Sequence, residues 1–249
     1  MFHKSIRQPI YNIYGFVRLA DEIVDTFHNH DKSTLIHEFE SETFEAIERG
    51  ISTNPVLHAF QHTVNKYNID HHLIRAFLES MKMDLDKTDY EPESYDKYIY
   101  GSAEVVGLMC LRVFCYDVPE QYGELVPHAR SLGSAFQKIN FLRDIQSDVE
   151  ERGRVYFPGI NFEEFSQEDK KQIEADILKD FQHAYIGILK LPRKARLGVY
   201  LAYVYYTKLF KKITGCSAHK IRTSRIRIPD SRKAVLLLSS TIRHNLNML

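Results

Sequence analysis

The chain has 249 residues, and its 33 Lys plus Arg residues balance 33 Asp plus Glu residues, so its formal net charge is zero. This balance gives no overall positive field of the kind that nucleic-acid-binding proteins use, and we expect no nucleic acid as a partner. The length allows one domain with a large core, while 11 glycines and 8 prolines are too few for a turn-rich β-protein.

Helical periodicity dominates the sequence, and short polar breaks separate the periodic stretches. The first predicted helix opens at Pro9 and runs to about Thr26. Further helices are predicted over residues 34–49, 54–68 and 70–86, and later over residues 166–189, 193–213 and 231–245.

The middle of the chain is predicted to form two longer helices. Ser94 is the predicted cap of a helix that contains the apolar stretch 105–114. Pro119 and Pro127 mark the approach to a helix around residues 140–148, and residues 151–161 form the clearest loop. Residues 226–229 are expected to be an extended connector. We therefore predict an all-α fold, with one domain over residues 1–249 and roughly eight to ten helices.

Two aspartate pairs share the same four-residue step: Asp21 with Asp25, and Asp144 with Asp148. Residues at this spacing lie on one face of a helix, and Asn140 extends the second row by one more turn. Two such rows facing each other would form a site for a hard cation, which takes carboxylate, amide and water oxygens.

Acidic pairs of this kind are common on solvated helix faces, so the pattern alone is weak evidence. Two further features favour an internal site. The neighbouring positions are apolar around both pairs, as at Ile23 and Ile145, and an arginine accompanies each row, Arg18 before Asp21 and Arg143 beside Asp144. Cations together with arginines suit a diphosphate group better than a protein partner.

Four segments carry a wider resemblance. They are YGFVRLADEIVD at residues 14–25, YIYGSAEVVGLM at 98–109, LGSAFQKINFLRDIQSDVEERGRVYFP at 132–158 and RIRIPDSRKAVLL at 225–237. In this order they resemble the first aspartate-rich motif, the tyrosine-containing helix, the second aspartate-rich motif and a C-terminal basic segment of the phytoene synthase and squalene synthase family. The resemblance is closest to bacterial phytoene synthases.

The resemblance implies an isoprenoid synthase-type helical bundle with a central apolar cavity. It also implies Mg²⁺, with Mn²⁺ as a substitute, and a catalytic role for the residues that hold it. The implied metal ligands are Asp21, Asp25, Asn140, Asp144 and Asp148. Such ions would neutralise the charge that builds on a leaving diphosphate.

The same carry-over assigns the substrate-binding residues. Those implied to bind diphosphate oxygens are Arg18, Arg143, Arg225 and Lys233, and those implied to line the substrate site are Tyr14, Gln137 and Tyr206. Tyr98 matches the tyrosine near the reacting carbons, where its oxygen and ring would steer the cation or take part in proton transfer; the alternative is a core ring. The motif favours Arg225 over Arg227, and Asp84 is expected to be structural.

Two departures from the family pattern stand out. Glu104 occupies a position where the family commonly has glycine, and it must find a partner or lie at an edge, because an unpaired buried carboxylate is costly. Family members also begin with a longer segment that carries a serine-rich element touching diphosphate. Here only seventeen residues precede Arg18, so that segment is expected to be missing.

The resemblance implies a transferase of carotenoid biosynthesis that joins two geranylgeranyl diphosphates head to head, through a cyclopropyl diphosphate intermediate, to give phytoene. Water would quench the cations, so an apolar wall is needed. The residues expected to supply it are Ile13, Val17, Val105, Leu108, Phe136 and Ile139. Two alternatives stay open: a squalene or dehydrosqualene synthase acting on farnesyl diphosphate, and a non-catalytic relative in complex assembly.

The expected location is the cytoplasm. The three cysteines have neither metal-binding nor disulfide spacing, which suits a reducing compartment, and no apolar stretch makes a persuasive membrane span. Because the product would be lipophilic, peripheral association with a membrane surface is a further hypothesis, and sedimentation with liposomes that leaves the protein unbound would count against it. The sequence does not indicate an oligomeric state.

Overall fold

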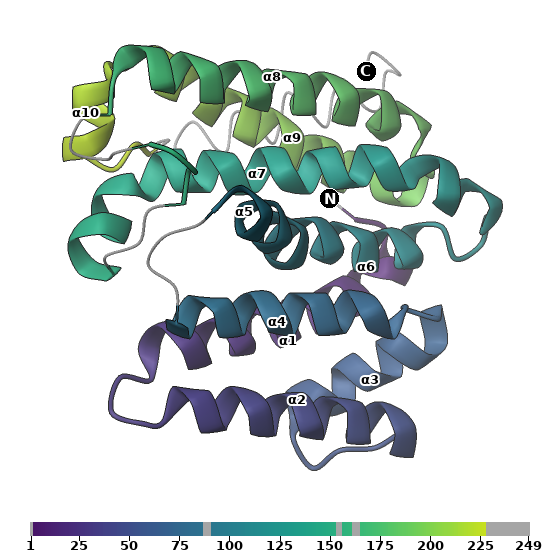
Figure 1. Cartoon of the computed structure of the whole chain (residues 1–249). Helices are drawn as coiled ribbons and strands as arrows, with labels where there is room; N and C mark the ends of the chain where they lie inside the picture. The colour runs from purple at the N-terminus through teal and green to yellow at the C-terminus, as the bar shows by residue number, and fades with distance from the viewer. Residues whose placement is uncertain (1, 87–90, 153–155, 161–164, 228–249) are drawn as a thin grey trace.

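The computed structural model describes residues 2–86, 91–152, 156–160 and 165–227 (Figure 1). All regular elements in this part of the chain are helices, which confirms the predicted all-α class. In chain order they are α1 (Lys4–Thr26), α2 (Lys32–Arg49), α3 (Pro55–Tyr67), α4 (His71–Asp86), α5 (Pro92–Ile99), the π-helical segment η1 (Tyr100–Glu104), α6 (Val105–Phe114), α7 (Glu120–Arg152), α8 (Gln167–Lys190), α9 (Arg193–Thr214) and α10 (Ala218–Thr223).

The helices form two groups around a middle layer (Figure 1). Helices α1 to α4 pack against one another on one side, while α8 and α9 pack on α7 on the other side. Helix α5, η1 and α6 lie between these groups and contact both α4 and α7. The long helix α7 therefore faces the first group across the middle of the molecule.

Each group has its own apolar core. In the first core the rings of Phe16 and Phe60 stack with centroids 3.9 Å apart, and Phe77 of α4 packs beside them. The second core lies among α7, α8, α9 and α10 and includes the buried side chains of Ile139 and Ile177. Each such side chain contributes roughly 1.5–3 kcal/mol when it is fully removed from water.

Several helix ends agree with the predictions because their signals are local. The Asn54 side chain accepts hydrogen bonds from the backbone N–H groups of Val56 and Leu57 at the start of α3. Asn68, at a φ of 49°, ends that helix in the left-handed conformation. Ser166 forms a capping box with Asp169 at the start of α8.

Three predicted features at prolines and caps are wrong. Helix α1 begins at Lys4, so Pro9 lies inside it. Proline has no backbone N–H, so the helical hydrogen bond to the carbonyl oxygen of Ser5 is missing, but Ser5 is exposed to water. Burial of the Ile6 side chain keeps the first turns helical. Pro127 likewise lies inside α7. Ser94 does not cap the middle helix, which starts at Pro92, and its hydroxyl donates to the carbonyl oxygen of Glu91 instead.

The later predictions have mixed outcomes. Helices α8 and α9 match their predicted ranges to within a residue or two, and α10 was not predicted. Helix α7 continues to Arg152, so the first two residues of the predicted loop are helical, and Ile226 and Arg227 have no regular structure. The predicted helix at 231–245 lies outside the described residues.

Glycines let η1 pack tightly between α4 and α7. A Cβ atom at Gly101 would lie 2.4 Å from the carbonyl oxygen of Ala76 on α4. A Cβ atom at Gly133 of α7 would lie 2.9 Å from the carbonyl oxygen of Ala103 on η1. Both contacts involve backbone atoms that cannot simply rotate away, so these positions require glycine. Ser102, next to Gly101, and Tyr98, three residues before it at the end of α5, are thereby held between α4 and α7.

Candidate functional site

A cavity of about 980 Å³ lies between α1 and α4 on one side and α7 on the other. We call it the polar cavity. All the described residues that the sequence predicts for the site line it: Tyr14, Arg18, Asp21, Asp25, Tyr98, Gln137, Asn140, Arg143, Asp144, Asp148, Tyr206 and Arg225. Lys233 lies outside the described residues.

The first acidic row belongs to α1, whose opposite face is buried in the core through residues such as Ile23. Asp21 and Asp25 lie one turn apart on the cavity side. Arg18 donates from Nη1 to Oδ2 of Asp21 at 2.9 Å and also pairs with Glu22. Because the side chains of Arg18 and Asp21 are 53% and 42% exposed, this ion pair contributes little to stability and can rearrange around a ligand.

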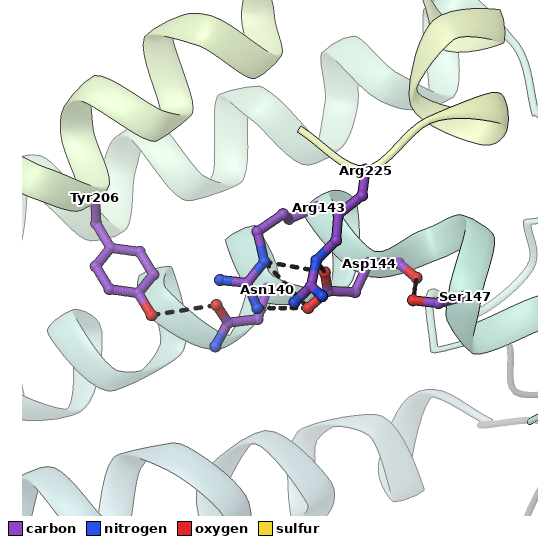
Figure 2. A network of polar contacts seen from close by, with 6 residues as sticks. All are labelled: Asn140, Arg143, Asp144, Ser147, Tyr206 and Arg225. Atoms are coloured by element: carbon purple, nitrogen blue, oxygen red, sulfur yellow. Dashed lines mark hydrogen bonds and ion pairs between the residues drawn. The ribbon is translucent and has the colours of Figure 1, made fainter. Parts of the chain in front are cut away.

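The second row belongs to α7 and is more deeply placed. Asp148 is 5% exposed and the Asp144 side chain 16%. Figure 2 shows two arginines converging on Asp144: Nε of Arg143 donates to Oδ1 at 3.0 Å, and Nε of Arg225 lies 2.6 Å from the same oxygen. Burial opposes the charge of Arg143, but the hydrogen bonds and charge of Asp144 outweigh it and raise the pKa of this guanidinium.

Tyr206 of α9 holds the amide of the second row. Its hydroxyl donates to Oδ1 of Asn140 at 3.2 Å, as Figure 2 shows, and its ring stacks on Phe136 at a centroid distance of 3.9 Å. Burial raises the pKa of Tyr206, so its hydroxyl stays protonated at neutral pH and remains a donor. This contact fixes the orientation of the Asn140 side chain at the cavity wall.

Tyr98 is only 4% exposed and lies among aromatic rings. Its ring stacks with Tyr156 at 5.5 Å and with Phe141 at 6.0 Å, and its hydroxyl donates to Oδ2 of Asp84 at 3.0 Å. Asp84, which the sequence analysis assigns to structure, therefore holds the hydroxyl of the predicted catalytic tyrosine and lines the polar cavity itself. Asp84 lies in the segment MKMDLDKTDY at residues 81–90, which resembles the family's sequence before the tyrosine-containing helix and could have indicated this role.

Other cavity residues were not predicted. Ser102 and Ser147 line the polar cavity, and so does Arg227 beside Arg225. Residues two apart in an extended segment point to the same side, so alternation does not separate Arg225 from Arg227. The connector is not a regular strand, and both residues reach the cavity.

A second cavity of about 430 Å³, which we call the apolar cavity, adjoins the first. The two cavities share four lining residues: Val17, Ser102, Asn140 and Tyr206. This confirms the expected apolar cavity but corrects its walls. Of the six predicted wall residues, only Val17 and Phe136 line it; Ile13, Val105, Leu108 and Ile139 are buried in the two cores. Helical periodicity identifies an inward face but cannot tell core from cavity.

The oxygen donors of the polar cavity fit a hard cation shared with a ligand. Within the described residues, no three His, Cys, Asp or Glu side chains come close enough to hold a metal ion by themselves. Mg²⁺ seldom uses such an all-protein cage; it is usually bound by one or two carboxylates together with water and substrate phosphates. Carboxylates and an amide on two facing helices, with arginines beside them, provide this kind of donor set.

Comparison with known sequences gives consistent matches. A sequence model of the squalene/phytoene synthase family matches residues 1–232. A 15-cis-phytoene synthase of Synechocystis sp. is 27% identical over 261 residues, which cover 95% of this chain and 77% of that protein. The chloroplastic phytoene synthase 3 of Zea mays is 26% identical over 258 residues, which cover 95% of this chain but only 59% of that protein. The presqualene diphosphate synthase of Rhodopseudomonas palustris is 29% identical over 154 residues, covering 61% of this chain and 53% of that protein.

Solved structures share the fold. A dehydrosqualene synthase in complex with a ligand superposes with a TM-score of 0.81 at 20% identity, covering 100% of this chain and 89% of that one. The squalene synthase HpnC from Alicyclobacillus acidocaldarius gives a TM-score of 0.73 at 22% identity, with 84% and 82% covered. These likenesses confirm the predicted helical bundle.

Proposed function

Since the chain belongs to the squalene/phytoene synthase family, we propose that it condenses two geranylgeranyl diphosphates head to head to phytoene. Relatives named as phytoene synthases and as a presqualene diphosphate synthase support a prenyltransferase that joins prenyl diphosphates. The choice of geranylgeranyl diphosphate, and of phytoene as product, is our proposal.

The observation that carries this function is the adjoining pair of cavities. The polar cavity is lined by five aspartates and by four arginines, Arg18, Arg143, Arg225 and Arg227, which suits a diphosphate with bound cations. The apolar cavity opens from it at Val17, Ser102, Asn140 and Tyr206, which suits a hydrocarbon tail. A prenyl diphosphate has both parts in one molecule.

Asp21, Asp25, Asn140, Asp144 and Asp148 would hold magnesium, which when bound supplies charge neutralisation to a leaving diphosphate. Arg143 and Arg225, which both pair with Asp144, would donate charge-assisted hydrogen bonds to phosphate oxygens. The half-exposed Arg18 would do the same from α1. These donors converge from α1, α7 and the connector after α10, so they would orient one diphosphate end.

Tyr98 is suited to act on the hydrocarbon end at the boundary of the polar cavity. Its hydroxyl proton is directed to Asp84, and its ring lies against Tyr156 and Phe141. Ring faces attract positive charge, so this cluster would steer an allylic cation while it excludes water.

Two other functions compete with this proposal. Farnesyl diphosphate requires the same diphosphate chemistry and would give a dehydrosqualene, or squalene where a hydride donor is also supplied. A non-catalytic role in complex assembly does not require acidic rows, yet both rows are retained and line one cavity.

Incubation of the purified protein with Mg²⁺ and each prenyl diphosphate, followed by mass spectrometry of the hydrocarbon, separates the three. We expect a forty-carbon hydrocarbon from geranylgeranyl diphosphate and none when EDTA is present. If only farnesyl diphosphate reacts and gives a thirty-carbon product, the protein is a squalene or dehydrosqualene synthase instead. If neither substrate gives hydrocarbon or released diphosphate, the enzymatic proposal is wrong.

A further inference from the structure

We propose that the ring of Phe2 forms the end wall of the apolar cavity and limits the tail to the four isoprene units of a geranylgeranyl group. This inference rests on the proposed function, because it assumes that the apolar cavity holds a prenyl tail.

The apolar cavity is elongated along its helices. On α7 its lining residues recur every three or four positions from Asn140 back to Leu125. At a rise of about 1.5 Å per residue, this stripe is about 22 Å long. Along η1 and α6 the lining residues extend in the same way from Ser102 to Phe114. Asn140 and Ser102 also line the polar cavity, so Leu125 and Phe114 mark the distal end.

This length can be compared with that of a prenyl tail. An extended chain advances by about 1.2 Å per bond, as the three-bond peptide repeat of roughly 3.6 Å shows. On that scale a geranylgeranyl tail needs about 18 Å and a farnesyl tail about 13 Å. The stripe on α7 therefore accommodates the longer tail and leaves only a few ångströms for the side chains that close the end.

Phe2 is held firmly at that end. Its ring lies 5.4 Å from the ring of Phe114, between centroids. It also lies so close to Gly198 of α9 that a Cβ atom there would be 2.5 Å from two ring carbons. The backbone N–H of His3 donates to the carbonyl oxygen of Lys194 at 3.0 Å, which holds the segment across the start of α9. The ring is thus a fixed wall.

Removal of the Phe2 ring would lengthen the channel, whereas a larger side chain at Ala202 would shorten it. On α9 the cavity is lined by Gly198, Ala202 and Tyr206 at successive four-residue steps, so Ala202 lies about 6 Å along the helix from Gly198, which contacts the end wall. A large side chain at Ala202 would therefore shorten the channel by about 6 Å, from about 22 Å to about 16 Å. It should exclude the fourth isoprene unit while leaving room for a shorter tail.

The test uses Phe2→Ala, Ala202→Phe and the control Ala175→Phe, an exposed position on α8 that lines neither cavity. Purified variants, checked for helical circular dichroism, compete farnesyl, geranylgeranyl and the five-unit geranylfarnesyl diphosphate for diphosphate release. We expect Phe2→Ala to raise the kcat/KM ratio of the five-unit to the four-unit substrate by about tenfold or more. Ala202→Phe should shift preference from four units to three by a similar factor, and Ala175→Phe should change neither ratio.

The binding of unreactive prenyl thiodiphosphates is measured in parallel, because their affinity reports tail length without turnover. One outcome is that the wild type releases no diphosphate while the two variants still shift the preferred tail length of these analogues, Phe2→Ala to five units and Ala202→Phe to three. In that case the proposed reaction is wrong and the end wall is supported. If Phe2→Ala folds and keeps the wild-type length preference, the end wall is wrong whatever the reaction. Should Phe2→Ala not fold, the milder Phe2→Leu takes its place with the same two outcomes, because only a change at Phe2 tests the end wall.

Discussion

Glu104 on η1 departs from the family pattern, and a neighbouring arginine offsets part of the cost of burying its carboxylate. Its side chain is 12% exposed, and Nε of Arg130 on α7 donates to its Oε2 at 2.5 Å. Burial raises the pKa of Glu104, while the hydrogen bond and charge of Arg130 lower it without cancelling the effect of burial. The sequence predicts that this carboxylate must find a partner or lie at an edge, and Arg130 is its partner.

A raised pKa has a definite consequence for stability. The folded protein holds the Glu104 proton more tightly than the unfolded chain does, so ionisation of this group costs stability as pH rises above its ordinary pKa of 4.5. We expect wild type to lose stability relative to Glu104→Gln as pH rises from about 4 to 7, by about 1.4 kcal/mol for each unit of pKa elevation. Urea unfolding of both proteins across this range measures the difference.

Glu124 provides a control of opposite sign. Its hydrogen bond with Lys190 lowers its pKa, so the stability that it contributes is present above the unfolded pKa and is lost as pH falls. Wild type should therefore gain slightly relative to Glu124→Gln over the same rise in pH. The same slope for both variants would contradict the role of burial at Glu104.

At the scale of elements, η1 determines how the middle layer meets its neighbours. Short π-helical segments inside α-helices often occur at functional sites. Here the segment begins two residues after Tyr98 and presents Ser102 to both cavities, while Gly101 lies against α4. The hydrogen bond between Tyr98 of α5 and Asp84 also joins the middle layer to α4, so the spacing between them affects the site.

Gly101→Ala tests this close approach. The new methyl group would meet the Ala76 carbonyl, so α4 must move, and we expect a loss of about 1–3 kcal/mol in the free energy of unfolding together with reduced turnover. Gly15→Ala in α1 is the matched control. Its Cβ would lie 3.8 Å from Val56 in ordinary contact, so it should stabilise the protein by about 0.5–1 kcal/mol. Urea midpoints measure both, and equal effects would contradict the proposed packing.

The sequence predicts elements well where their signals are local. Asn54 and Ser166 cap the helices that they were predicted to start, because a cap needs only its own neighbours. Pro9 and Pro127 mislead, because burial of flanking apolar residues outweighs one lost hydrogen bond. The π-helical turn at η1 could not be predicted, since it depends on packing between α4 and α7.

At the scale of the whole molecule, the aspartate pairs show how far a local pattern can predict a site. The four-residue step placed each pair on one helix face, and the fold brings both faces to one cavity although more than a hundred residues separate them. The wall residues could not be predicted in this way. Ile13 and Val17 both point inward from α1, yet only Val17 lines a cavity. The single domain over residues 1–249 stays a prediction.

None of the described helices has an apolar stretch long enough to cross a bilayer. Under the proposed function, prenyl tails bind in the apolar cavity, which adjoins the polar cavity. The proposed reaction requires the acidic rows of α1 and α7 to act on one diphosphate together with Mg²⁺.

Calorimetric titration of inorganic diphosphate tests that claim most directly, in wild type, Asp21→Ala and Asp144→Ala, with the exposed Asp117→Ala as control. We expect wild type and Asp117→Ala to bind diphosphate only when Mg²⁺ is present. Each cavity variant should lose this binding while its helical circular dichroism is unchanged, because each removes one carboxylate from one of the two rows. Binding that does not need Mg²⁺, or near-normal binding by Asp21→Ala or by Asp144→Ala, would contradict the joint action of the two helices.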